Sequence, residues 1–243
     1  MIDLHCHILP AIDDGAADLT DSVAMARQAA ADGIEVICAT PHIRHDHDVR
    51  IDELADRVEE LNRELGDHDV PVRIARGGEV AETALAGLDQ TELERVALGG
   101  GRWILLEPAP GPLSDSLEAA VETLAGDGMG AVIAHPERHL AEDLLARLAR
   151  LIERGALVQA TAAYLAHPET APGMATMAQH GLIHVLGSDA HSAAFGRTAT
   201  LSEGLAALAE IEPAASHREW IAHEAPGAIL GGEPLGPPFP PRT

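Results

Sequence analysis

The sequence predicts an α/β protein whose parallel sheet closes into a barrel. Two observations carry this prediction. Strand-like and helix-like segments alternate about seven times with short connections, and a His or a carboxylate follows the end of six of the seven strands. Alternating β and α elements imply parallel strands joined by right-handed crossovers. The length of 243 residues suits one such domain, because single α/β barrels commonly run to about 200–250 residues.

An open, doubly wound sheet is the alternative arrangement of the same elements. That fold typically carries a glycine-rich nucleotide-binding turn after its first strand. Here the first strand leads instead into His5-Cys6-His7. The sequence therefore favours the barrel over the open sheet.

The hydrophobic pattern predicts each element in turn. Alternating residues or β-branched apolar runs indicate strands, and apolar residues three and four apart, bounded by caps such as Asp18 and Gly33, indicate helices. Strands are predicted at Met1–His7, Ile34–Thr40, Val70–Ala75, Trp103–Leu106, Gly130–Ala134, Ala156–Ala160 and Ile183–Leu186. Helices are predicted at Asp18–Asp32, Ile51–Leu65, Ser114–Ala125, Ala141–Arg154, Ala171–His180, Thr200–Glu210 and Ser216–His223.

One domain is expected to span residues 1–230. The segment from Gly231 to Thr243 is rich in Gly and Pro, so it is predicted to be an extended surface strap or disordered. Apolar residues make up 46% of the chain, which is enough for a sizeable core. No window approaches the ~18 consecutive apolar residues of a membrane span, and no basic start followed by an apolar run marks a signal peptide. We therefore expect a cytoplasmic protein without membrane insertion.

The charge balance excludes several classes of function. Sixteen basic residues against 39 acidic ones give a formal charge of −23, which argues against a nucleic-acid partner, because phosphate backbones need a positive surface. Every basic residue is Arg, so lysine-based chemistry is ruled out in this chain. Two cysteines do not make a disulfide framework.

Candidate metal ligands gather at the predicted strand ends, which converge on one mouth in a barrel. His5 and His7 stand two apart on a strand, so their imidazoles point to the same face and form a good chelate. A set of His and carboxylate ligands without thiolate suits Mn²⁺, Zn²⁺ or Fe²⁺. The full set exceeds the needs of one ion and predicts a multinuclear site. Its members are His5, His7, Asp14, His42, Glu79, Glu107, His135, Asp189 and His191.

Two arginines follow these ligands at the same mouth. Arg138 comes three residues after His135, and Arg197 comes six after His191. A guanidinium suits bidentate phosphate contacts, and each arginine has a surface ion pair as its alternative role. Asp13 is interpreted as part of the turn that enters the first helix. His45, His47 and His68 are interpreted as solvated, with His45 and His47 near enough to rim the site.

A thiolate mechanism is a competing possibility that the sequence argues against. Cys38 and Arg44 have the Cys-x5-Arg spacing of thiolate phosphatases. Those loops bind phosphate through backbone N–H groups, which Pro41 lacks, and Cys38 falls inside an apolar strand. Nothing nearby is expected to lower the pKa of a buried thiol. Cys6 points away from His5 and His7, and packing is its expected role.

The motifs together resemble a known family. The N-terminal stretch from Met1 to Pro10, with Asp13-Asp14-Gly15, is similar to the start of the PHP (polymerase and histidinol phosphatase) superfamily. The closer resemblance is to its manganese-dependent tyrosine-protein phosphatases of capsular and exopolysaccharide operons. The later motifs match in order and approximate spacing, and they are Ala39-Thr-Pro-His42, Gly78-Glu79, Leu106-Glu107, Ala134-His-Pro-Glu-Arg138 and Ser188-Asp-Ala-His191.

The resemblance implies a distorted (β/α)7 barrel with three metal ions, expected to be Mn²⁺. By this resemblance His5, His7, Glu79 and Asp189 hold the first ion. Glu79, Glu107 and His135 hold the second, and Asp14, His42 and His191 hold the third. Arg138 and Arg197 bind phosphate as the catalytic arginines. Departures from the family pattern are Gln159-Ala-Thr-Ala at the sixth strand and Pro-Ala-Pro after Glu107.

The expected function is a metal-dependent phosphomonoesterase that acts on protein phosphotyrosine, with a bacterial tyrosine kinase as its partner. A metal-bridging hydroxide would attack phosphorus in line. The alternative substrate is a small phosphate ester, such as histidinol phosphate or a sugar phosphate. An amidohydrolase-like metal hydrolase also begins with His-x-His on its first strand, and a degenerate binding module is the non-enzymatic alternative.

Overall fold

Nine strands and nine α-helices form the secondary structure of residues 1–242, which the computed structural model describes. The strands are β1 (Ile2–Cys6), β2 (Val36–Ala39), β3 (His42–Ile43), β4 (Arg73–Arg76), β5 (Glu79–Ala81), β6 (Trp103–Glu107), β7 (Gly130–Ile133), β8 (Leu157–Thr161) and β9 (Val185–Gly187). The helices are α1 (Leu19–Asp32), α2 (Leu54–Asp67), α3 (Gln90–Val96), α4 (Asp115–Gly126), α5 (Leu144–Glu153), α6 (Ala162–Ala166), α7 (Ala171–Gln179), α8 (Ser202–Leu208) and α9 (Ala225–Leu230).

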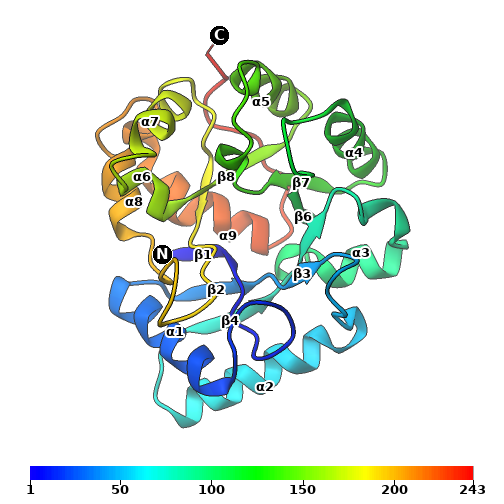
Figure 1. Cartoon of the computed structure of the whole chain (residues 1–243), viewed down its shortest axis with the longest axis vertical. Coiled ribbons are helices and arrows are strands. Elements are labelled where there is room, and N and C mark those ends of the chain that lie inside the picture. Colours follow the sequence, from blue (N-terminus) through cyan, green and yellow to red (C-terminus); the bar gives the residue numbers. More distant parts are fainter. Residues whose placement is uncertain (243) are drawn as a thin grey trace.

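The strands form a curled parallel sheet that helices surround (Figure 1). One part has the order β1-β2-β4, and the other has the order β3-β5-β6-β7-β8-β9. Between β2 and β3 lie Thr40 and Pro41, and proline has no N–H to donate to a ladder. At the free edge of β1, a bridge joins Cys6 to Ala190, just past β9. The prediction of a mixed α/β fold with parallel strands is confirmed.

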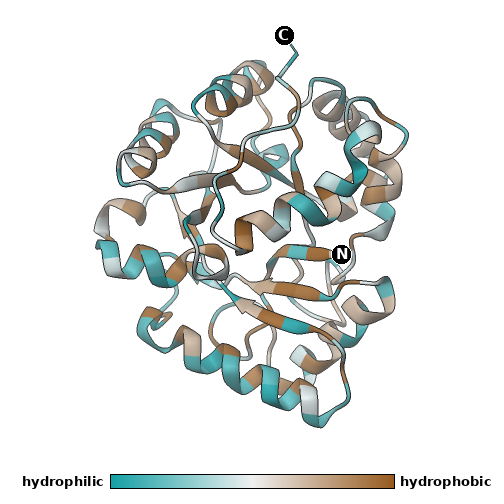
Figure 2. Cartoon of the chain, turned by 180° about the vertical axis from the view of Figure 1, so that it is seen from behind, coloured by the Kyte–Doolittle hydropathy of each residue, from teal (hydrophilic) through white to brown (hydrophobic). Residues whose placement is uncertain are grey.

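Two apolar cores hold the sheet in place. The inner core lies between the strands and α9, and it consists mainly of Leu4, Cys38, Ala75, Leu98, Trp103, Leu105, Val132, Ala134, Leu157, Val185, Ala225 and Ile229. The outer core lies between the sheet and the surrounding helices. Figure 2 shows the strands mostly brown and the helices with teal and brown turns in alternation. Each helix thus buries one face and leaves the other in water.

Several element boundaries differ from the predictions. Apolar residues at Ile34, Val70 and Val72 are buried in the outer core but stand outside strands, so β2 and β4 are shorter than predicted. The predicted final helix at 216–223 is helical but irregular, and it continues into α9. Short 3-10 and π turns occupy that region, and a regular helix begins only at Ala225, where Pro226 fits the first turn.

Sequence reasoning missed four short elements: β3, β5, α3 and α6. For α3 a signal was present, because Asp89 and Glu92 form a capping box at its start. No comparable signal marks β3 or β5, which are strands of two and three residues. Among residues 1–242 no helix has the length and hydrophobicity needed to cross a bilayer.

The C-terminal segment from Gly231 to Arg242 runs as an extended strap. The Trp103 Nε1–H group donates a hydrogen bond of 2.8 Å to the carbonyl of Glu233. Further along, Phe239 is 7% exposed and packs against the rings of His184, at 5.7 Å, and His217, at 5.0 Å. The strap therefore adds a buried aromatic contact with His184 and His217.

Removal of the Phe239 ring tests this contribution. We expect Phe239→Ala to lower the free energy of unfolding by about 3 kcal/mol, because it removes a buried aromatic side chain. The matched control is Phe195→Ala, since Phe195 is 80% exposed and its loss is expected to change stability by less than about 0.5 kcal/mol. Urea unfolding of both variants measures the difference, and equal effects would contradict the packing role of the strap.

Candidate metal centre

All nine predicted ligands form one cluster, and His42 and Glu79, the first residues of β3 and β5, come shortly after the carboxyl ends of β2 and β4. The nine ligands come from β1, β3, β5 and β6 and from the segments that follow β1, β7 and β9. Four groups of donor atoms within it each lie within 4.8 Å of one another. These groups are His5/His7/Glu79, His7/Asp14/His42/His191, His5/His135/Asp189 and His42/Glu79/Glu107.

The geometry of the first group fits one metal ion. The Nε2 atoms of His5 and His7 lie 3.2 Å apart, and each lies 3.3 Å from Oε2 of Glu79. Ligands about 2.1 Å from a common ion are separated by about this distance. Oε2 of Glu79 is buried and has no hydrogen-bond partner. A buried carboxylate oxygen without a donor is costly, so the three residues fit a cation.

Glu79 connects this group to the rest of the cluster. Its Oε1 atom lies 2.7 Å from Nε2 of His135, while Oε2 also lies 3.0 Å from Nδ1 of His42. One carboxylate thus faces imidazoles on two sides, which is the arrangement of a bridging ligand. The surrounding imidazoles, His5 first among them, hold the pKa of Glu79 well below its usual value although burial opposes this.

The second group lies nearer to solvent. Oδ1 of Asp14 is 3.4 Å from Nε2 of His42 and 3.6 Å from Nε2 of His191. The rings of His7 and His191 stack at 3.9 Å. Burial and the neighbouring His7 lower the pKa of His191 to about 3. The imidazole is therefore neutral at physiological pH, which is the form that binds a metal.

Glu107 and His135 are grouped differently from the set that the resemblance implies. Glu107 groups with Glu79 and His42, and His135 groups with His5 and Asp189. Nη1–H of Arg44, just after β3, donates to Oε1 of Glu107 at 3.4 Å, on the same side of the cluster as His42. The sequence singled out Arg44 only through its Cys-x5-Arg spacing with Cys38, and not as a partner of Glu107.

Two of the candidate ligands have unusual backbone conformations. His135 has φ of 31° and Asp189 has φ of 50°, a region that side chains with a Cβ rarely adopt. Such conformations cluster at functional sites, where surrounding structure enforces them. Here the backbone N–H of Asp189 donates to the carbonyl of His5 at 2.7 Å, which fixes Asp189 beside β1.

Asp13 has a role that the sequence interpretation missed. Its carboxylate accepts a turn hydrogen bond from the Gly15 N–H, as expected of a helix-entry turn. The same carboxylate lies 2.8 Å from Nδ1 of His7 and accepts from the backbone N–H of His42 at 3.0 Å. A carboxylate at Nδ1 fixes the ring and its tautomer, so that Nε2 is free to bind a metal. Asp13 therefore forms the predicted turn and is also a positioning residue for His7.

Gln159 of β8 holds the other imidazole of the chelate. Its Oε1 atom lies 3.0 Å from Nδ1 of His5 and accepts from the backbone N–H of His135 at 3.3 Å. Gly187 permits this packing, because a Cβ there would lie 2.6 Å from Cβ of His5. The departure from the family pattern at Gln159 therefore places a long amide where it can reach His5.

The two predicted arginines meet at a single carboxylate. A guanidinium nitrogen of Arg138 contacts Oδ2 of Asp189, and Nη2 of Arg197 lies 3.2 Å from the same oxygen. Nε–H of Arg197 also donates to the carbonyl of Asp189 at 2.8 Å. Their positive charges are thus concentrated beside the ligand cluster, where an anionic group can be bound.

The three histidines interpreted as solvated lie in different surroundings. His47 is half-buried and stacks on the ring of His42 at 5.0 Å, so it rims the site as predicted. His45 and His68 are exposed. His47 belongs to the wall of the site because the chain after β3 folds back over His42.

Neither cysteine has the properties of a nucleophile. Cys38 lies in the inner core, fully buried. Burial raises the pKa of its thiol to about 12, and burial also raises the pKa of Cys6 well above its usual value. The sequence-based argument against a thiolate is confirmed by these surroundings.

The fold and the cluster define the class: an α/β protein with a candidate multinuclear metal centre at the carboxyl ends of its parallel strands. Residues 1–230 match the sequence model of the family described as "Capsular polysaccharide synthesis, CpsB/CapC". The chain belongs to this family, and the resemblance stated from its motifs is confirmed.

Relatives within the family are described as tyrosine phosphatases. The tyrosine-protein phosphatase YwqE of Bacillus subtilis (strain 168) is 35% identical over 199 residues, which cover 79% of this chain and 78% of the relative. The tyrosine-protein phosphatase CpsB of Streptococcus pneumoniae is 29% identical over 207 residues, covering 79% and 83%.

One solved structure belongs to the same family, and a more distant one shares only the fold. A structure from work on YwqE of B. subtilis and CpsB of S. pneumoniae, described there as metal-dependent tyrosine phosphatases, matches with a TM-score of 0.83 and 31% identity. It covers 100% of this chain and 98% of that chain. A β-aspartyl dipeptidase of Fervidobacterium islandicum AW-1 matches with a TM-score of 0.56 and 12% identity, covering 97% and 77%. The second likeness concerns the fold alone.

The positioning role of Asp13 can be tested by metal titration. We expect Asp13→Asn to weaken binding of the tightest divalent ion by about 10–100-fold, because the carboxylate at Nδ1 of His7 is lost. The control is Asp18→Asn, which removes a nearby carboxylate but keeps a good N-cap for α1. Isothermal titration calorimetry gives both affinities, and an unchanged affinity in Asp13→Asn would contradict the assignment.

The buried thiols predict resistance to alkylation. With a pKa of about 12 for Cys38, about one thiol in 10⁴ is ionised at pH 8, and only the thiolate reacts. We therefore expect no iodoacetamide adduct on the native chain in one hour, and two adducts after unfolding in urea. Mass spectrometry counts them, and rapid labelling of native Cys38 would revive the thiolate mechanism.

Proposed function

We propose that this chain is a metal-dependent phosphatase that hydrolyses phosphotyrosine in proteins. The observation that carries the proposal is the meeting of Arg138 and Arg197 at Asp189, beside a cluster of nine candidate ligands. Phosphate ester hydrolysis needs cationic groups that neutralise the phosphoryl oxygens and a means to activate water. Membership of the CpsB/CapC family supports tyrosine phosphate as the substrate class.

The proposed metal content is three divalent ions, with Mn²⁺ as the preferred metal and Zn²⁺ or Fe²⁺ as alternatives. His5, His7, Glu79 and Asp189 would hold the first, Glu79, Glu107 and His135 the second, and Asp14, His42 and His191 the third. The unpartnered buried oxygen of Glu79 supports a cation there, and Glu79 joins the two members of the second set because its Oε1 lies 2.7 Å from Nε2 of His135 and it also groups with Glu107. Such ions, when bound, lower the pKa of water and polarise phosphoryl oxygens.

The chain's own contribution is orientation and charge. Asp13 and Gln159 orient the imidazoles of His7 and His5, as their hydrogen bonds indicate. Arg138 and Arg197 would turn from Asp189 to the phosphoryl oxygens of the substrate and hold them in line for attack. Because a tyrosine leaving group has a pKa of about 10, departure needs less protonation than that of an alkoxide.

The finer assignments belong to the same proposal. Counting β2 with β3 and β4 with β5 as interrupted single strands gives seven, and the bridge from Cys6 to Ala190 supports a distorted (β/α)7 barrel. We infer one catalytic domain at residues 1–230, in line with the extent of the family match.

A bacterial tyrosine kinase is the proposed partner of this chain. The cytoplasm is its proposed location, and regulation of capsule or exopolysaccharide synthesis is its proposed role.

A substrate panel with controlled metal tests the function. We expect phosphate release from a phosphotyrosine peptide to stop after exhaustive chelation and to return with Mn²⁺ more than with Zn²⁺ or Fe²⁺. Release from histidinol phosphate and a sugar phosphate should be slower by at least about 10-fold at matched metal concentration, a difference of about 1.4 kcal/mol in barrier. Faster hydrolysis of a small ester would favour the alternative substrate, and full activity without metal would reject the mechanism.

The phosphate-binding role of Arg197 has a kinetic test. We expect Arg197→Ala to lower kcat by about 10²–10³ with metal content unchanged, because a preorganised charged contact is worth about 3 kcal/mol in the transition state. Arg197→Lys should restore activity only in part, since an ammonium lacks the planar fork. The control is Arg218→Ala on the exposed surface. Normal turnover in Arg197→Ala would show that Arg197 does not bind phosphate and only forms a surface ion pair.

A further inference from the structure

An apolar groove opens beside Arg138, between α5 on one side and α6 and α7 on the other. Its volume is about 420 Å³, within the range of sites that accept small ligands or single side chains. The apolar side chains that line it are Leu140, Leu144, Leu145, Tyr164, Met174 and Met177. None of these residues belongs to the metal-ligand cluster.

The groove is continuous with the phosphate-binding end of the candidate centre. The guanidinium of Arg138 lies over the ring of Tyr164, 5.8 Å from its centroid, so Tyr164 belongs to both the groove wall and the surroundings of Arg138. Leu140 follows Arg138 by two residues, which places their Cα atoms within about 7 Å. A group attached to a phosphate at Arg138 can therefore reach the groove.

Leu140 is unusually exposed for its type. Its exposed fraction is 81%, and among residues 1–242 only Phe195, at 80%, is a comparably exposed large hydrophobic residue. Phe195 itself lies two residues before Arg197, so both exposed apolar side chains flank an arginine of the site. Single exposed apolar residues are common on protein surfaces. Here the two that are most exposed both stand next to an arginine of the site, which indicates that an apolar group of a ligand contacts this surface.

The polar residues of the groove define the charge of its occupant. Three carboxylates line it, from Glu137, Glu142 and Glu169, and none of its lining residues is basic. The chain as a whole carries a formal charge of −23. Charge complementarity therefore favours a partner segment with basic residues next to its apolar side chain.

We propose that this groove docks the substrate polypeptide beside the phosphotyrosine, with an apolar side chain against Leu140 and Tyr164 and a basic residue near the carboxylates. The inference rests on the proposed function, because phosphate at Arg138 anchors the segment. It adds a determinant of substrate choice that lies outside the metal centre. The occupant is a segment of a phosphotyrosine protein that carries basic residues and has an apolar side chain next to the phosphotyrosine.

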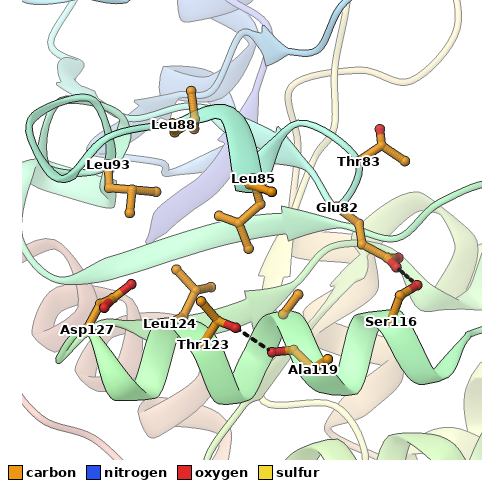
Figure 3. A pocket seen from close by; sticks show the side chains of 12 residues that line it. Glu82, Thr83, Leu85, Leu88, Leu93, Ser116, Ala119, Thr123, Leu124 and Asp127 are labelled. Atoms are coloured by element: carbon orange, nitrogen blue, oxygen red, sulfur yellow. Dashed lines mark hydrogen bonds between the residues drawn. The ribbon is translucent and has the colours of Figure 1, made fainter.

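A second groove of similar size provides an internal control. It has a volume of about 470 Å³ and lies between α4 and the chain from Glu82 to Leu93 (Figure 3). The picture places Glu82 at one end, where Ser116 donates to its carboxylate, and Leu88 toward the other. Its lining residues include neither arginine of the site. A change at Leu88 therefore alters a groove of the same kind without touching the proposed docking surface.

The experiment compares two phosphotyrosine peptides of equal charge. Both carry arginines, and they differ by leucine or serine at the positions flanking the phosphotyrosine. For the metal-loaded wild-type chain we expect kcat/KM to be about 10-fold higher for the leucine peptide. Leu140→Asp should reduce this ratio to below about 2, while Leu140→Met should keep it. Leu88→Asp should leave it at the wild-type value. Replacing the peptide arginines by glutamine should lower wild-type kcat/KM severalfold.

The small substrate p-nitrophenyl phosphate separates failure of this inference from failure of the proposed function. If it and both peptides release no phosphate, the proposed function falls and the groove assignment falls with it. If the peptides are hydrolysed but the leucine preference is absent, or survives in Leu140→Asp, the function stands and the docking groove is overturned. If size-exclusion chromatography shows that Leu140→Asp loses a dimer while the preference persists, the groove belongs to a second copy of the chain.

Discussion

The buried carboxylate of Glu79 is the constraint on which the site depends. It is fully buried, and its two oxygens face His135 on one side and His5, His7 and His42 on the other. An unpaired oxygen in such a place is costly without a cation, and the Nδ1 atoms of His5 and His7 are already engaged by Gln159 and Asp13. The cluster is therefore understandable as a candidate cation site with Glu79 at its centre.

The parallel sheet satisfies this constraint because it brings ligands that are distant in the sequence to the same end of the sheet. β5 begins at Glu79, directly beside His42 of β3 in the ladder, so two ligands are neighbours by register. The turn residues His135 and Asp189 have positive φ, which directs their side chains back over the strand ends. The apolar inner core fills the space beneath, from Leu4 to Ile229, and gives the cluster a rigid base.

The charge distribution explains why the arginines matter. The chain carries 39 acidic residues, yet Arg138, Arg197 and Arg44 all contact carboxylates of the site. These three guanidinium groups offset part of the negative charge of Asp189 and Glu107. The local positive charge of these arginines favours binding of an anion at the ligand cluster although the molecule as a whole is strongly acidic. In the proposed docking, the apolar groove beside Arg138, which Glu137, Glu142 and Glu169 also line, selects substrates by the charge of the residues that flank the phosphotyrosine.

The sequence by itself determined the class of fold, the family and the residue types at the strand ends, because periodicity and motif spacing are local properties. His5 and His7 lie on the same face of a strand wherever that strand packs. Only the tertiary structure decided which of these residues face each other. Arg44 contacts Glu107, Asp13 reaches His7, and Gln159 reaches His5 across 154 positions of sequence. Such partners depend on how strands distant in the chain pack together, and no local pattern records that packing.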